Sequence, residues 1–352
     1  MSGLEADLDL PERGVRLELQ VPAGETCALI GPNGAGKSSV LEAIIGVLPI
    51  ARGHVVLGGR VLTGPGERIP IHRRRVGWLP QRPLLFEHLS VLDNVAFGAV
   101  ATGGSRAEAR RRAGAELDRV GASDLAARSP GALSGGQAQR VAIARCLAAD
   151  PDALLLDERL AAVDVEGAGE IRTVLADRLR GLRLPVLLVT HDLIELWRLA
   201  DRVLVLEGGR IVAGGSVAEV LGRPRTDFLA SLGGRNLIAG SASGPDELTS
   251  GALVVHGRPD APLPAGTATL ALIDPAAISV HRAHPEGSPR NVWSAIVSAV
   301  EPRGDAVRLT ALAADVPLAV DLTLAAVAEL DLAPGVRIWL AVKASQVVLY
   351  PR

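Results

Sequence analysis

The sequence predicts an α/β fold over the first two thirds of the chain and a small all-β barrel over the last third. Three observations support this prediction. An apolar run leads through a glycine-rich loop into a stretch of helical periodicity. Further apolar runs before residue 232 end in polar residues, as parallel strands do at a ligand crevice. From Gly233 onward, proline, glycine and serine separate short β-like runs that lack a helical pattern.

The composition limits the class of protein. The 352 residues are enough for two domains or more. The net charge of -2 and the pI near 6.4 give no general case for nucleic-acid binding. No apolar run approaches the ~18 residues of a membrane span, and the N-terminal segment lacks the layout of a signal peptide. We expect the two cysteines, Cys27 and Cys146, to be reduced core residues of a cytosolic protein.

The glycine-rich loop organises the rest of the chain. It reads GPNGAGKS and matches the phosphate-binding pattern G-x-x-x-x-G-K-[ST]. A strand that ends in such a loop and opens a helix aims backbone N–H groups and the positive helix end at one point, where polyphosphate binds. Lys37 would reach the β- and γ-phosphates, and the Ser38 hydroxyl would ligate Mg²⁺. The residues predicted to hold the nucleotide here are Gly31, Pro32, Asn33, Gly34, Ala35, Gly36, Lys37, Ser38 and Ser39.

Other segments of the first two thirds predict regular elements. Residues 1–25 alternate apolar and polar side chains, which indicates antiparallel strands. Residues 54–62 predict a hairpin that turns at Gly58–Gly59. Residues 82–133 predict a mainly helical insert, in which Ser105 begins a capping box ahead of an arginine-rich helix. We expect these arginines to form a solvated helix face.

A second glycine loop opens a second helix. Ser134, Gly135, Gly136 and Gln137 precede the helical stretch 138–149 and form a second anion site by geometry. One chain has no use for two such sites on one triphosphate. Two chains packed head to tail would, because the second loop of each chain could close on the nucleotide held by the other. The sequence therefore predicts a homodimer.

Polar residues with catalytic chemistry follow the apolar runs. Gln81 ends a strand, where its amide could bridge Mg²⁺ and the attacking water, although a glutamine there is more often a plain loop residue. Asp157 is placed to hold the Mg²⁺ shell, and Glu158 to polarise water for attack on the γ-phosphate. Asp164 lies in the following loop. His191 ends another apolar strand and points at the ligand crevice, although a lone histidine is usually structural.

Over residues 1–232 the order and spacing of these motifs resemble the ATP-binding subunits of ABC transporters. GPNGAGKS looks like Walker A, Gln81 the Q-loop, LSGGQ the signature, ALLLDE Walker B, Asp164 the D-loop and His191 the switch histidine. The resemblance implies an α/β P-loop NTPase fold, an ABC cassette with a helical subdomain at about 82–150, that binds ATP and Mg²⁺. It also implies that Gln81 couples nucleotide state to a membrane partner, that Asp164 lies at the nucleotide, and that His191 contacts the γ-phosphate.

The chain departs from this family at two places. Arg159 stands where the family usually has a proline after the catalytic glutamate, which affects loop rigidity and adds a cation that lowers the basicity of Glu158. The family also usually stacks adenine on an aromatic residue ahead of Walker A, but no Phe, Trp or Tyr precedes Trp78. Arg13, Arg16 or Val15 would then contact the base, and base selectivity would be weaker.

The last third predicts a small all-β, OB-like barrel of the oligonucleotide/oligosaccharide-binding type. We assign residues 233–287 to a linker and the first β half of this region, and residues 288–352 to a separate domain that forms its second half. Leu270–Val280 and Trp339–Leu349 form a weak internal echo with strand–turn–strand patterning. Asp274 in the first segment stands where Lys343 stands in the second.

Residues 288–352 resemble a Mop domain, the molybdate-binding (TOBE-like) module. Ser288-Pro289-Arg290-Asn291 looks like its opening S-x-R-N, and Lys343-Ala344-Ser345 its closing K-A-S. The resemblance implies an oxyanion site, since a tetrahedral dianion needs N–H groups, hydroxyls and a compact cation. An unpaired Lys343 would be costly to bury in this apolar context, so it either reaches water or faces an anion. The predicted oxyanion residues are Ser288, Arg290, Asn291, Lys343 and Ser345. The alternative is a barrel that only stabilises a dimer.

The whole chain resembles the ATPase subunit of a molybdate importer. The resemblance implies a peripheral homodimer on the cytoplasmic face of the cell membrane, beneath integral permease subunits, with an external solute-binding protein as an indirect partner. The solute would be molybdate or tungstate. One alternative is an importer of another solute, such as sulfate or a sugar. Another is a soluble ABC ATPase of DNA repair or translation, but such proteins normally carry two cassettes or a coiled-coil insert.

Overall fold

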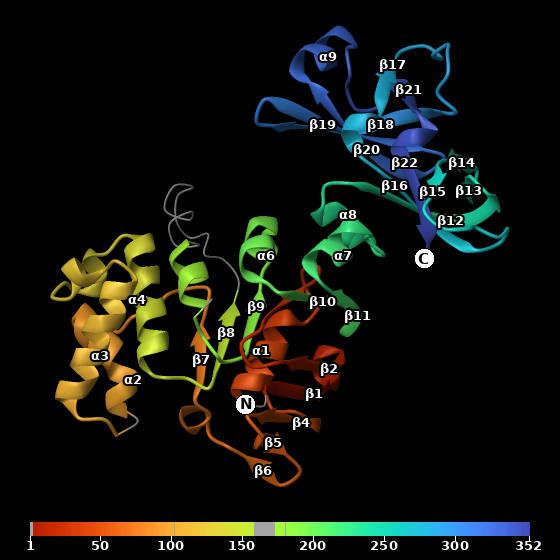
Figure 1. Cartoon of the computed structure of the whole chain (residues 1–352). Coiled ribbons are helices and arrows are strands. Elements are labelled where there is room, and N and C mark those ends of the chain that lie inside the picture. Colours follow the sequence, from red (N-terminus) through yellow and green to blue (C-terminus); the bar gives the residue numbers. More distant parts are fainter. Residues whose placement is uncertain (1–2, 102, 158–172, 180) are drawn as a thin grey trace. The chain divides into compact units, whose positions relative to one another are not determined.

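The computed structural model describes residues 3–101, 103–157, 173–179 and 181–352 (Figure 1). Glu158, Arg159 and Asp164 lie outside the described residues. The chain divides into two compact units, Met1–Val220 and Leu221–Arg352. The sequence-based boundary at 232/233 falls after two short helices, α7 (Val217–Gly222) and α8 (Asp227–Leu232).

The first unit contains a five-stranded antiparallel sheet in the order β2-β1-β4-β5-β6. Its strands are β1 (Leu4–Leu10), β2 (Val15–Val21), β4 (Arg52–Leu57), β5 (Arg60–Gly64) and β6 (Glu67–Arg68). Alternate side chains of β2 are buried and exposed, so its apolar residues share one face. The predicted hairpin is confirmed, because β4 and β5 join through Gly58 and Gly59, both at positive φ. The antiparallel strands expected within residues 1–25 are also confirmed.

The second sheet of this unit has the order β11-β10-β3-β9-β8-β7. Its strands are β3 (Thr26–Ile30), β7 (Val76–Leu79), β8 (Ala153–Asp157), β9 (Val186–Val189), β10 (Arg202–Glu207) and β11 (Arg210–Gly215). All pairs except β10–β11 are parallel. The carboxyl ends of β3, β9, β8 and β7 therefore meet at one edge, where α/β sheets bind ligands. Helix α1 (Lys37–Ile45) follows β3, and α6 (Leu193–Leu199) follows β9.

The expected helical insert is present. Its main helices are α2 (Val91–Ala101), α3 (Arg106–Arg119) and α4 (Gly135–Ala148). Ser105 caps α3, since its hydroxyl accepts the Glu108 N–H at 3.2 Å. The arginines of α3 lie at the surface in pairs such as Arg110–Asp93, which confirms the solvated face. Short 3-10 helices connect the elements of the unit: η1 (Pro11–Arg13), η2 (Ile71–Arg73), η3 (Ser123–Leu125) and η4 (Pro130–Ala132).

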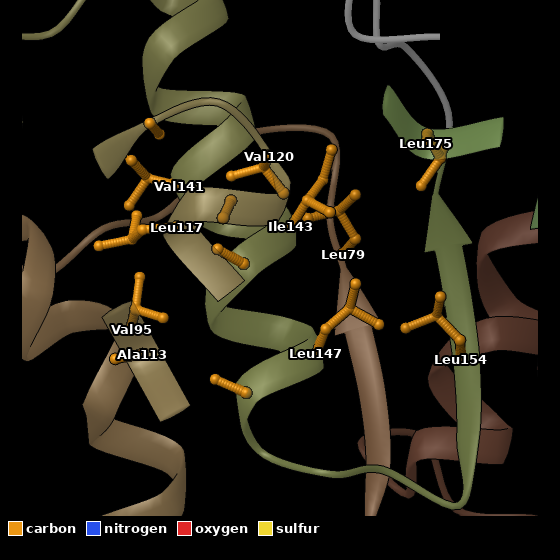
Figure 2. Close-up of a cluster of buried hydrophobic side chains, with 14 of the residues drawn as sticks. Leu79, Val95, Ala113, Leu117, Val120, Val141, Ile143, Leu147, Leu154 and Leu175 are labelled. Atoms are coloured by element: carbon orange, nitrogen blue, oxygen red, sulfur yellow. The ribbon is translucent and has the colours of Figure 1, made fainter. Parts of the chain in front are cut away.

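One hydrophobic core joins the helices to the sheet. Figure 2 shows Leu79 of β7 and Leu154 of β8 in the same cluster as Val95 of α2, Leu117 of α3 and Ile143 of α4. A second cluster lies between the two sheets and around α1. Both cysteines are free, and burial raises the pKa of each thiol to about 12, which keeps them protonated at neutral pH.

The second unit is mainly β, with the short helices α8 and α9 (Leu324–Glu329) and two 3-10 turns. Its sheets have the orders β14-β13-β12-β16-β22-β15 and β17-β21-β18-β19-β20. The strands are β12 (Asn236–Gly244), β13 (Glu247–Ser250), β14 (Leu253–His256), β15 (Arg258–Pro259), β16 (Ala268–Ile273), β17 (Ser279–His281), β18 (Asn291–Arg303), β19 (Ala306–Ala313), β20 (Val316–Thr323), β21 (Arg337–Val342) and β22 (Val347–Pro351). One core, from Ile238 to Leu349, includes residues from both expected halves. The all-β, OB-like prediction is confirmed.

The predicted internal echo is also confirmed. Strands β16 and β17 are joined by the 3-10 helix η5 (Pro275–Ala277), and β21 and β22 by η6 (Ala344–Gln346). Each segment is therefore a strand, a single 3-10 turn and a second strand.

A buried arginine holds the end of helix α1. Arg74 is 1 % exposed, and its guanidinium donates to the Ile44 carbonyl at 2.8 Å, the Ile69 carbonyl at 2.9 Å and the Thr63 hydroxyl at 2.7 Å. Gly46 makes room for it, since a Cβ there would lie 2.4 Å from the Arg74 Cζ. The cation also lies at the negative end of α1, which is favourable.

We predict that Arg74→Ala lowers the free energy of unfolding of the first unit by about 2–4 kcal/mol, because it leaves buried carbonyls without donors. Calorimetric unfolding measures this loss. The exposed Arg110→Ala on α3 is the control and should cost less than about 1 kcal/mol. Equal losses in the two variants would contradict the role of the Arg74 guanidinium.

Candidate functional site

The glycine-rich loop approaches its neighbours too closely for side chains at two positions. A Cβ on Gly31 would lie 2.0 Å from the Leu206 carbonyl oxygen, and a Cβ on Gly36 would lie 2.3 Å from the Val15 Cγ2. Gly36 also has φ +104°, which favours glycine. The loop backbone therefore lies directly against β2 and β10, with its N–H groups ahead of α1. This cradle of bare backbone suits a polyphosphate.

The side chain of Lys37 folds back onto the backbone at the start of the loop. Lys37 is 8 % exposed, and its ammonium donates to the Gly31 carbonyl at 2.7 Å and to the Pro32 carbonyl at 3.1 Å. Ser38 is exposed and Ser39 half-buried, both in the first turn of α1. A positive charge, a hydroxyl and the start of a nine-residue helix therefore meet at the loop.

The strand register brings further predicted residues to the same edge of the sheet. Asp157, half-buried, is the last residue of β8 and pairs with Val189, the last residue of β9. Val189 in turn pairs with Leu29, just before the loop. Exposed His191 follows β9 by two residues, and exposed Gln81 follows β7 by two. The structure therefore gathers Asp157, His191 and Gln81 at the edge where the loop lies.

The turn that carries His191 is fixed on both sides. The buried Thr190 hydroxyl donates to the Glu195 carboxylate at 2.5 Å and accepts the Asp192 N–H at 3.0 Å. The Asp192 carboxylate accepts the Ile194 N–H at 2.7 Å and so caps α6. Thr190 and Glu195, which hold this turn, are not among the residues predicted from the sequence. The Asp-x-x-Glu spacing of a capping box at residues 192–195 was the available signal.

The second glycine loop provides the N-cap of the helix that follows it. Ser134 accepts the Gln137 N–H at 3.3 Å, and the Gln137 side chain accepts the Ser134 N–H at 3.1 Å. Ser134 and Gly135 are exposed, whereas Gly136 is buried. The loop is therefore a rigid helix start that presents Ser134 and Gly135 at the surface of the unit.

Two of the three residues expected to contact the base remain available. Val15 is 1 % exposed and packs under Gly36, so it offers no surface to a base. Arg13 and Arg16 are exposed on either side of it. The backbone N–H of Arg16 donates to the Gly209 carbonyl at 2.8 Å, which fixes the start of β2.

The predicted oxyanion residues lie at neighbouring strand ends in the second unit. Asn291 pairs with Val342, so S-x-R-N and K-A-S are adjacent across β18 and β21. The Asn291 amide is 1 % exposed and is committed within the fold: its oxygen accepts the His256 N–H at 2.7 Å and its nitrogen donates to the His256 carbonyl at 2.8 Å. Arg290 is ion-paired with Asp246 at 2.5 Å.

Lys343 lies in the turn between β21 and β22 and is exposed. The lysine therefore reaches water, one of the two expected outcomes, because the apolar residues on either side belong to two strands and Lys343 stands at the break between them. Among the residues that the structure describes, none forms a hydrogen bond or ion pair with the Lys343 ammonium. Ser288 and Ser345 are also exposed.

Comparison with known proteins assigns the family. The family model "ABC transporter" matches residues 15–161. The chain is 46% identical over 364 residues to the "Molybdenum import ATP-binding protein ModC" of Mycobacterium tuberculosis, with 100% of this chain and 98% of that protein covered. The chain belongs to the family of ABC transporter ATP-binding proteins. The α/β fold of its first unit is that of the ABC cassette.

Two further comparisons concern this ABC protein. It is 32% identical over 336 residues to the "Molybdate/tungstate import ATP-binding protein WtpC" of Pyrococcus horikoshii, with 95% of each chain covered. The solved structure of cbiO1 from Clostridium perfringens, part of the ABC transporter complex cbiONQ, matches with a TM-score of 0.56 and 30% identity, covering 62% of this chain and 90% of that one.

The second unit also matches a family model. The TOBE domain model covers residues 287–349, which contain all five predicted oxyanion residues. Within residues 3–101, 103–157, 173–179 and 181–352, no helix has the length and apolar content needed to cross a membrane.

We predict that GTP competes with ATP to within about tenfold, because aromatic stacking worth about 1–3 kcal/mol per base is replaced by a weaker contact with Arg13 or Arg16. Equilibrium binding of both nucleotides to the full-length Glu158→Gln chain gives the ratio. Arg13→Ala and Arg16→Ala identify the contributing side chain, with the exposed Arg60→Ala on β5 as control. A preference for ATP above about 100-fold would contradict the prediction.

Proposed function

We propose that this chain is the ATP-hydrolysing subunit of an importer for molybdate, or tungstate, and works as a homodimer on the cytoplasmic face of the cell membrane beneath integral permease subunits. Each cycle converts ATP, water and external molybdate into ADP, phosphate and internal molybdate. An external solute-binding protein delivers the solute. The observation that carries the proposal is the match of both units, over their full length, to a protein named for molybdenum import.

The residues at the sheet edge suit ATP hydrolysis. Lys37 and the loop N–H groups would bind the β- and γ-phosphates, and Ser38, Gln81 and Asp157 would hold Mg²⁺, which neutralises phosphate charge. Glu158 would act as general base toward water. His191 would contact the γ-phosphate, and the bond between Thr190 and Glu195 keeps its turn rigid.

The second glycine loop supports the homodimer. Ser134 and Gly135 are exposed at the N-terminus of α4, a helix of 14 residues. A partner's triphosphate would place negative charge at this positive helix end. Head-to-tail packing then gives each nucleotide the Gly31–Ser38 loop of one chain and the Ser134–Gln137 loop of the other, with Asp164 at the same interface.

We predict that Glu158→Gln lowers ATP turnover by about 10²-fold or more while nucleotide binding is kept, because only the proton acceptor is lost. The variant should therefore accumulate as an ATP-dependent dimer, which light scattering detects. Adding Ser134→Arg should remove this dimer without affecting binding at the Gly31–Ser38 loop. Near-normal turnover of Glu158→Gln would point to another base, and a dimer that survives Ser134→Arg would contradict the head-to-tail arrangement.

The second unit offers donors for an oxyanion. The side chains of Lys343, Ser345 and Ser288 are exposed, whereas the Arg290 guanidinium contacts both the Asp246 carboxylate and the His256 ring. Such a set combines positive charge with hydroxyls that can donate, which suits a tetrahedral dianion. A sugar has no charge for Lys343 to recognise. Sulfate remains the chemically closest alternative solute.

We predict that the full-length chain binds molybdate and tungstate more tightly than sulfate or phosphate, and that Lys343→Ala weakens molybdate binding by about tenfold or more through loss of a charge-assisted bond. Titration calorimetry measures both effects. Arg337→Ala, an exposed cation at the other end of β21, is the control and should leave binding unchanged. Tighter binding of sulfate would favour the sulfate importer, and no heat with any oxyanion would contradict a binding role for this unit.

A further inference from the structure

The second unit is built from two copies of one substructure, although the TOBE model matches only the second. Each copy begins with Arg-Asn at the start of a long strand, β12 or β18, continues through a hairpin, β13–β14 or β19–β20, and ends in a strand, a 3-10 turn and a strand. The register agrees as well. Asn236 pairs with Ile273, directly before Asp274, and Asn291 pairs with Val342, directly before Lys343.

The two copies are joined by hydrogen bonds from an asparagine side chain of each copy to the backbone of the other. The Asn236 side chain accepts the Ala319 N–H at 2.7 Å and donates to the Ala319 carbonyl at 2.8 Å. The Asn291 side chain makes the same two bonds to His256, at 2.7 and 2.8 Å. Ala319 belongs to β20 of the second copy, and His256 to β14 of the first. Each buried amide therefore satisfies one backbone N–H and one carbonyl of the other copy.

The strands after each turn are exchanged between the copies. Strand β16 pairs with β22, and β17 pairs with β21. Each 3-10 turn thus lies where the chain passes from one sheet to the other. The residues that begin the two turns have nearly the same backbone conformation, φ -74° and ψ 127° at Asp274 against φ -71° and ψ 139° at Lys343.

The chemistry of the two turns is opposite. The Asp274 carboxylate is negative and accepts the Ala276 N–H at 2.9 Å, and Pro275 has no N–H to offer. The position of Ser345 is occupied in the first turn by Ala276, which has no hydroxyl. In the second turn, Lys343 brings a positive charge and its side chain caps no backbone group. The first turn therefore repels an oxyanion and gives it no donor.

We propose that only the second copy binds an oxyanion, so that each chain holds one, and that Asn291 is a positioning residue that orients the Lys343 turn rather than a ligand. This inference rests on the proposed function. The Asn291 side chain is 1 % exposed, and its oxygen and one of its two N–H groups already bond to His256, so it offers an anion almost no accessible surface. Asn236 performs the same structural task beside a turn that binds nothing.

Titration calorimetry of the full-length chain with sodium molybdate tests the proposal. One molybdate is expected per chain, Lys343→Ala should weaken binding by about tenfold or more, and Asp274→Ala should leave it within about twofold. Two molybdates per chain, or equal weakening by Asp274→Ala and Lys343→Ala, would overturn the proposal while leaving the oxyanion role intact. Absence of molybdate binding by the unmodified chain would instead overturn the oxyanion role itself.

The two asparagines give a matched pair for the positioning role. Asn291→Ala and Asn236→Ala should lower the melting temperature similarly, since each removes the same two bonds, but only Asn291→Ala should raise the molybdate Kd, by about fivefold or more. Equal effects of both variants on Kd would overturn the assignment. If either alanine variant does not fold, the corresponding serine pair keeps one polar group and gives the same comparison.

Discussion

The close approach of the Gly31–Ser38 backbone to its neighbours is the constraint on which the first unit depends. Gly36 lies against Val15 of the antiparallel sheet, and Gly31 against Leu206 of the parallel sheet. The loop therefore lies where the two sheets meet, and the bond from the Arg16 N–H to the Gly209 carbonyl joins them beside it. A side chain at either glycine would push the sheets apart. The packing of the two sheets therefore requires the same glycines that shape the Gly31–Ser38 loop.

In the second unit, the side-chain amides of Asn236 and Asn291 connect the two sheets by hydrogen bonds to backbone groups. Each asparagine reaches one residue of the other copy and satisfies both of its backbone groups, which would otherwise be costly to bury. The sheets also exchange strands at the 3-10 turns. This arrangement leaves the turns at the surface, and so it allows Asp274 and Lys343 to differ in charge without any effect on the core.

The sequence predicted features that depend on local pattern and missed those that depend on distant partners. The glycine loop, the Gly58–Gly59 hairpin and the two strand–turn–strand segments follow from glycine placement and periodicity within a few residues. The Asn236 bonds could not be predicted, because Ala319 lies 83 residues away along the chain. The exposure of Lys343 agrees with one of the two expected outcomes for this side chain, that it reaches water. The roles of all the predicted site residues remain predictions, and Glu158 and Asp164 also lie outside the described residues.

Arginine and lysine have different roles in this chain. The ion pairs Arg290–Asp246 and Arg308–Asp321 use arginine, and in the latter two guanidinium nitrogens contact the two carboxylate oxygens at 2.7 Å each. Such planar pairing fixes a charge in one place. The only two lysines, Lys37 and Lys343, belong to the two sites that we assign to oxyanions. The lysine ammonium is a compact charge that can contact one oxygen of a tetrahedral anion. Unlike a guanidinium, it does not require a planar carboxylate as its partner.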